Sequence, residues 1–225
     1  LFITFLLQTI SNIEKYDNIL NISESGGVFM GEEITSSARL EDKLINSNFF
    51  KQLANKKDKY GENVITKTGQ KLKYVFEIAN AFNLDSETMA AITILHDISS
   101  PCFGEATEAV ICDKAPNCSR INYANTIART ILEGEKQEKL DKICNGVAEV
   151  ITGENLSTPE AQVVEIINYG HEFSESIADR NGRTVFMASY ISEVIKQSKQ
   201  HGAIVAIKIP EMPDLRLREG DTNRA

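Results

Sequence analysis

Apolar residues recur at intervals of three and four along most of the chain, which is the spacing of helices with one buried face. The clearest run covers 67–84, where the apolar positions are Leu72, Val75, Phe76, Ile78, Ala79 and Phe82. The same spacing predicts further helices over 85–97, 121–132, 140–151, 159–177 and 184–199. We therefore predict an all-α helical bundle.

Polar residues mark where several of these helices begin. Asp85 or Ser86 can cap the helix that ends near the His-Asp pair at 96–97, because short polar side chains accept bonds from the free N–H groups of a first turn. Pro159 follows Thr158 and suits the first turn of the helix predicted over 159–177. These signals predict where the two helices begin.

The end of the chain has a different pattern. Residues 202–209 (GAIVAIKI) alternate and are rich in β-branched side chains, so they are the candidate for a short C-terminal strand. The charged, Pro-containing stretch 210–225 reads as a mobile tail.

Composition excludes some functions. The 225 residues carry 24 Lys+Arg against 32 Asp+Glu, a net charge of −8, which argues against a nucleic-acid scaffold. No apolar run approaches the roughly 20 residues of a membrane span. The 4 cysteines form no CxxC pair, which favours reduced thiols in a cytoplasmic protein.

Candidate chemistry is concentrated in 95–108 (LHDISSPCFGEATE). Adjacent His96 and Asp97 offer an imidazole nitrogen and a carboxylate oxygen to one divalent metal. The segment resembles the HD motif of the deoxynucleoside triphosphate triphosphohydrolases, the dGTPase branch of the HD superfamily, which reads approximately HD(I/L)GHPPFGHxGE. The matching residues are His96, Asp97, Ile98, Pro101, Phe103, Gly104 and Glu108.

The resemblance covers about 34–200. It divides the chain into an N-terminal extension (1–33), an HD-type helical domain (34–200) and a C-terminal tail (201–225). Upstream, ITSSARLEDK at 34–43 is similar to the family's SSAFRRL–x–x–K segment. By this resemblance Arg39 and Lys43 are the residues that would meet nucleotide phosphates.

The metal site departs from the family pattern. The family's first His position holds Lys67 and its last Asp position holds Asn168, so two of the four family ligands, His96 and Asp97, remain. Asn168 can still offer a carbonyl oxygen, but without charge. Protonated lysine has no lone pair to ligate a metal. We expect the Lys67 ammonium to occupy the space of the metal, opposite Asp97. His171, one turn after Asn168, is either a replacement ligand or a surface or capping histidine.

The catalytic positions differ too. Glu105 stands where the family has a histidine after Phe-Gly, and Asn122 stands where it has a second one. Glu105 is a candidate general base if burial raises its pKa. Glu108 keeps the family's glutamate, and the general acid has no evident replacement.

The resemblance implies a metal-dependent hydrolase, with a divalent ion of the Mg or Mn class, that releases triphosphate from a deoxynucleoside triphosphate. The altered site predicts reduced or lost activity. The alternative is an inactive HD scaffold that binds nucleotide or regulates an intact paralogue by oligomerisation, and a decaying gene copy is a third interpretation. The family is commonly oligomeric, so a homo-oligomer is expected.

Overall fold

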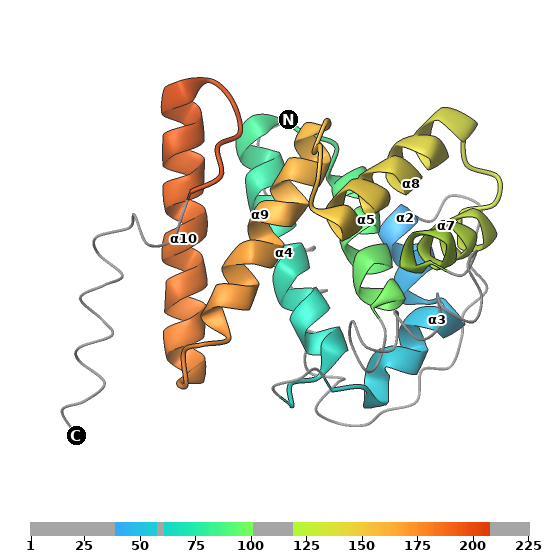
Figure 1. Ribbon diagram of the computed structural model, residues 1–225, viewed down its shortest axis with the longest axis horizontal. Coiled ribbons are helices and arrows are strands. Elements are labelled where there is room, and N and C mark those ends of the chain that lie inside the picture. Colours follow the sequence, from blue (N-terminus) through green and yellow to red (C-terminus); the bar gives the residue numbers. More distant parts are fainter. Residues whose placement is uncertain (1–38, 58–60, 101–118, 208–225) are drawn as a thin grey trace, which may run out of the picture.

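A computed structural model describes residues 39–57, 61–100 and 119–207. These residues form a helical bundle, which confirms the predicted all-α class (Figure 1). Its elements are α2 (Leu40–Ile45), α3 (Asn48–Lys51), the 3-10 helix η1 (Gln52–Asn55), α4 (Val64–Phe82), α5 (Ser86–Ser99), α7 (Arg120–Ile131), α8 (Gln137–Thr152), α9 (Pro159–Ser174) and α10 (Arg180–His201).

Helix α5 lies at the centre of the bundle. It packs against α2, α4, α7, α8 and α9. The stretch from Met89 to Leu95 is buried on every side, as expected for a helix that is apolar around its whole circumference. Its last turn carries the His-Asp pair, so this pair is held where several helices meet.

The predicted helix starts are confirmed at two positions. The Asp85 carboxylate accepts a bond from the Thr88 backbone N–H (3.1 Å) and caps α5. The Thr158 hydroxyl accepts from the Ala161 N–H (3.2 Å), with Pro159 in the first turn of α9. Both caps satisfy N–H groups that have no partner within the helix.

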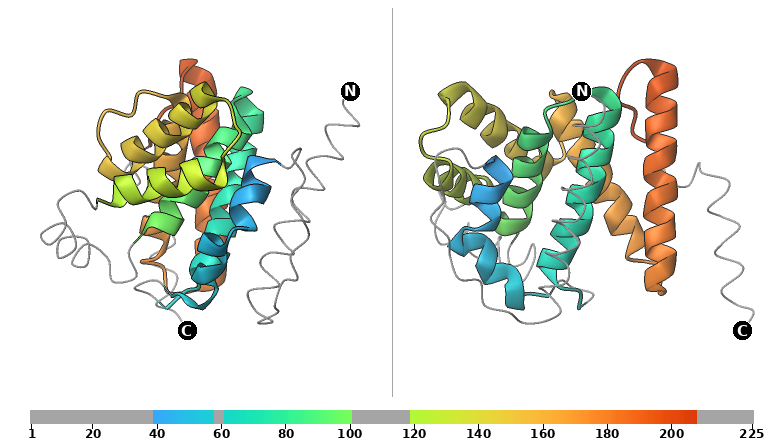
Figure 2. Two further views of the ribbon diagram at one scale, coloured as in Figure 1. Left: turned by 90° about the vertical axis from the view of Figure 1, so that its right-hand side faces the viewer. Right: turned by 180° about the vertical axis from the view of Figure 1, so that it is seen from behind.

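Helix α10 forms one flank of the bundle, against α9 and α4, while α7 and α8 lie on the far side of α5 (Figures 1 and 2). The approach of α10 to α9 is close because Gly170 presents no side chain there. A Cβ atom on Gly170 would lie 2.6 Å from two ring carbons of Tyr190. The absence of a Cβ atom at Gly170 therefore allows the close approach of α9 and α10.

The strand prediction at 202–209 is wrong for the residues that are described. Gly202, with φ of 69°, ends α10 in the left-handed region, and 204–207 run on without strand pairing. The Val205 N–H donates to the Ser198 hydroxyl (3.0 Å), and Ile207 is buried. The β-branched residues here pack onto helices, because no neighbouring strand is available to complete a ladder.

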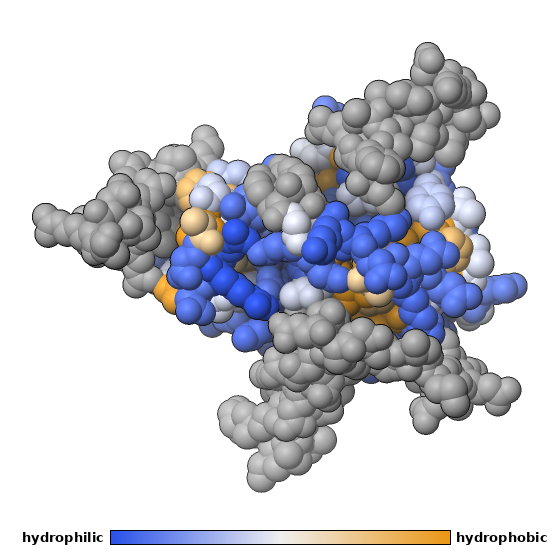
Figure 3. Space-filling model, turned by 90° about the horizontal axis from the view of Figure 1, so that it is seen from below, coloured by the Kyte–Doolittle hydropathy of each residue, from blue (hydrophilic) through white to orange (hydrophobic). Residues whose placement is uncertain are grey.

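The surface of the described part is mainly polar. Seen from below, hydrophilic side chains dominate and apolar ones show in small separate patches (Figure 3). No helix among these residues is long and apolar enough to cross a membrane.

We expect Gly170→Ala to lower the free energy of unfolding by about 1–3 kcal/mol, because the new methyl group overlaps a buried ring. Urea denaturation measures the change. Gly182→Ala is the control: its Cβ lies no closer than 3.1 Å to another atom, and it gains the same helix propensity. Equal effects of the two substitutions would contradict the assigned close approach.

Candidate functional site

The Asp97 carboxylate at the end of α5 is buried against α4. Thr68 and Lys71 lie one turn apart on α4 and therefore face the same side. The Thr68 hydroxyl donates to Oδ2 of Asp97 (2.7 Å) and the Lys71 ammonium donates to Oδ1 (2.7 Å). His96 Nδ1 lies 3.1 Å from the same Oδ1. Both oxygens of Asp97 are thus engaged by protein groups.

These contacts set the protonation of the pair. Burial raises the pKa of Asp97, but the Lys71 charge and the bonds from His96 and Lys71 outweigh it and hold the pKa well below its usual range. Burial lowers the pKa of His96 to about 4, opposed by Asp97 and assisted by the charges of Lys71 and Arg120. At neutral pH the site holds a carboxylate, an ammonium and a neutral imidazole.

We expected Lys67 opposite Asp97, and the structure brings a second lysine, Lys71, to this region as well. The Lys67 ammonium forms an ion pair with the Glu175 carboxylate just after α9, and the ammonium on Asp97 belongs to Lys71. Lys71 follows Lys67 by one turn on the same face of α4, and that spacing is the sequence signal that could have found it. Two lysines therefore enter the region where the family resemblance places a metal.

Asn168 and His171 complete the cluster from α9. His171 is buried with its ring centroid 6.1 Å from that of Tyr74, so the interpretation as a surface histidine is wrong. Both polar atoms of the Asn168 side chain and Nε2 of His171 are buried without a hydrogen-bond partner in the part of the chain that the structure describes. Burial lowers the pKa of His171 to about 3, and the charges of Lys71 and Lys67 act in the same direction. The imidazole is thus neutral at physiological pH.

The residues present do not fit a divalent metal. Asp97 is the only carboxylate among the four candidate ligands, and both its oxygens are bound by protein donors. An ammonium about 4 Å from a divalent ion opposes binding by roughly 8 kcal/mol at an effective dielectric constant near 20. Across the described ranges, no three His, Cys, Asp or Glu side chains are grouped to hold a metal ion.

The phosphate-binding candidates are not at this cluster. Arg39 Nε lies 3.0 Å from Glu41 and 3.8 Å from Glu87 in the first turn of α5. Asp97 is ten residues further along α5, about 15 Å along the axis at 1.5 Å per residue. The Lys43 ammonium bonds Glu135 (2.6 Å).

Three predicted catalytic residues remain. The Asn122 side chain is exposed in the first turn of α7, and its backbone N–H donates to the capping Ser119 hydroxyl (3.1 Å). Glu105 and Glu108 lie outside the described residues.

Comparison with known proteins yields no match to any family model, curated protein or solved structure.

Breaking the buried Lys71–Asp97 pair should be costly from either side. We expect Lys71→Met and Asp97→Asn each to lower the free energy of unfolding by about 3–5 kcal/mol, since each leaves one buried group unpaired. The double variant should cost clearly less than the sum, measured by urea denaturation as a double-mutant cycle. The exposed Lys196–Glu193 pair (3.1 Å) is the control, with an expected cost under about 1 kcal/mol. Additive costs at Lys71 and Asp97 would refute the pairing.

The two buried histidines should make stability fall in mild acid. Each has a folded pKa below the unfolded value near 6.5, so their contribution is full above about pH 6.5 and decreases as pH falls toward 4. At pH 5 the loss is up to about 2 kcal/mol for each histidine. Asp97 does not confound this range, because its own contribution is lost only below about pH 4.

Urea denaturation at pH 7.5 and pH 5 measures this effect. His171→Gln should remove about half of the pH-dependent loss, whatever its cost at pH 7.5. The exposed His201→Gln is the matched control and should leave the loss unchanged. An unaltered pH dependence in His171→Gln would show that this imidazole is not buried in its neutral form.

Proposed function

We propose that the chain is an HD-type helical domain, resembling the deoxynucleoside triphosphate triphosphohydrolases, that has become a non-catalytic scaffold. In this role it assembles with another copy of itself or with an intact paralogue. The observation that carries the proposal is the Lys71 ammonium, bonded at 2.7 Å to the carboxylate of the HD pair. The protein thereby supplies its own cation where the related enzymes would hold a metal.

Charge supports the loss of catalysis. A metal-binding site of this kind needs carboxylates free to bind a cation, but Asp97 is neutralised by Lys71 and Glu175 by Lys67. Asn168, at the position of the family's last aspartate, contributes an uncharged amide. No residue of the cluster is therefore placed to activate water through a metal or to polarise a phosphate through one.

The contacts of the basic residues argue against nucleotide binding. Arg39 and Lys43, the positions expected to meet phosphates, instead contact Glu41, Glu87 and Glu135. A triphosphate would have to compete with these carboxylates for both cations. The assembly itself rests on the family resemblance, in which oligomers are common.

Metal binding and turnover test the proposal directly. Titration with Mn²⁺ followed by calorimetry should show no binding to the full chain, and dGTP with Mn²⁺ should release no triphosphate above the buffer rate. Light scattering on the same sample should give a mass above that of one 25.0 kDa chain. Triphosphate release by the unmodified protein would overturn the non-catalytic role. A monomeric mass for the protein alone would exclude assembly with a second copy and leave assembly with an intact paralogue.

A reconstructed site tests the ligand assignment. We expect the triple variant Lys67→His, Lys71→Leu and Asn168→Asp to gain Mn²⁺ binding, because it removes two ammonium groups and restores an imidazole and a carboxylate. The control carries Lys73→Leu in place of Lys71→Leu, since Lys73 is exposed on the same helix. Equal binding by both variants would show that Lys71 does not occupy the metal position.

A further inference from the structure

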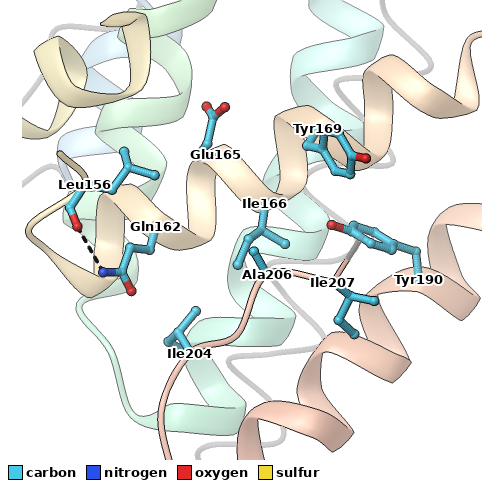
Figure 4. A pocket seen from close by; sticks show the side chains of 9 residues that line it. All are labelled: Leu156, Gln162, Glu165, Ile166, Tyr169, Tyr190, Ile204, Ala206 and Ile207. Atoms are coloured by element: carbon cyan, nitrogen blue, oxygen red, sulfur yellow. Dashed lines mark hydrogen bonds between the residues drawn. The ribbon is translucent and has the colours of Figure 1, made fainter. Parts of the chain in front are cut away.

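A cavity of about 550 Å³ lies between α9, α10 and the segment 204–207 (Figure 4). None of its lining residues belongs to the Asp97 cluster. Its volume is in the range of small-molecule sites, roughly 300–1,000 Å³. The apolar part of the lining comes from Leu156, Ile166, Ile204 and Ile207.

Tyr190 places a polar atom at this cavity. Its ring is fully buried, stacked near Phe186 with centroids 6.1 Å apart, and its hydroxyl has no hydrogen-bond partner among the described residues. In Figure 4 the hydroxyl points from α10 toward α9. A buried tyrosine hydroxyl normally finds a partner, and leaving it unpaired costs about 1–3 kcal/mol. The unsatisfied hydroxyl therefore indicates a ligand group that is missing.

The other polar groups of the lining are mainly acceptors. No hydrogen bond or ion pair from the described residues engages the Glu165 carboxylate, which lies one turn before Tyr169 on α9. The Gln162 side-chain NH₂ donates one N–H to the Leu156 carbonyl (3.0 Å), which leaves its second N–H and its amide oxygen for a ligand. Burial raises the pKa of Glu165 and the charge of Glu172 adds to this effect, while the charge of Lys71 opposes it. A bound cation would offset both the burial and the charge of Glu172.

We propose that this cavity binds a small amine with an apolar, ring-sized body and one protonated nitrogen. The body packs on Ile166, Ile204 and Ile207. The ammonium donates to the Glu165 carboxylate and to the Tyr190 hydroxyl oxygen, with the face of the Tyr169 ring available to the cation. Uncharged and anionic molecules of the same shape lack the positive charge that pairs with the Glu165 carboxylate.

Three probes of similar shape and different charge test the assignment on the full chain by calorimetry at pH 7. They are 2-phenylethylamine, 2-phenylethanol and 3-phenylpropionate. The amine should bind about tenfold or more tightly than the alcohol, and the carboxylate should not bind. Failure of all three to bind, or equal affinity for all three, would overturn the proposal.

Matched variants locate the binding. Glu165→Gln should remove the preference for the amine, whereas Glu172→Gln, the same charge change at an exposed position outside the lining, should retain it. Tyr190→Phe removes one oxygen and should weaken the amine about fivefold or more. Equal effects of the two Glu variants would refute the role of Glu165.

Blocking the cavity supplies a test that does not depend on charge. Ala206→Phe fills it and should abolish binding of every probe, while Ala203→Phe, just before the segment 204–207 and outside the lining, should not. Retained binding in Ala206→Phe, with unchanged melting temperature, would place the probe elsewhere. These outcomes are independent of Mn²⁺ binding, so failure here leaves the proposed scaffold role standing.

Discussion

The bond between the Lys71 ammonium and the Asp97 carboxylate is the interaction on which the interior of this protein depends. It joins the middle of α4 to the last turn of α5, the helix against which most of the others pack. Two buried charges lose their hydration, and such a pair is tolerated only when its remaining bonds are satisfied. Thr68 and His96 satisfy those of Asp97.

The same face of α4 makes a second connection of this kind. Lys67, one turn before Lys71, pairs with Glu175 at the end of α9. A metal ion would tie three helices together through ligands from each of them. Here two lysines on one helix hold a carboxylate from α5 and another from α9, so protein cations perform the structural part of that task. In the proposed scaffold role these cations would hold the helices together without activating water.

Helix positions could be predicted because periodic burial and capping are local properties. Asp85 and Thr158 cap the helices that their side-chain chemistry predicts. Lys71 was not predicted as a core residue, although it follows Lys67 by one turn, because lysine is almost never fully buried unless paired and its partner Asp97 is distant in sequence. The strand at 202–209 was predicted from β-branched residues such as Ile204, yet these side chains pack over α9 and α10. Burial by tertiary contacts, not local pattern, decides both cases.

Several buried polar atoms on helix α9, and one on the neighbouring α10, have no hydrogen-bond partner among the described residues. Asn168 and His171 have buried polar atoms without partners, and so does Tyr190, whose ring packs against Gly170. Each unpaired group costs stability, and natural proteins keep few of them. The Asp97 carboxylate, by contrast, has both of its oxygens bound by side chains of this chain. For Tyr190 on α10, the amine that we propose for the adjacent cavity would offset the cost of the unpaired hydroxyl.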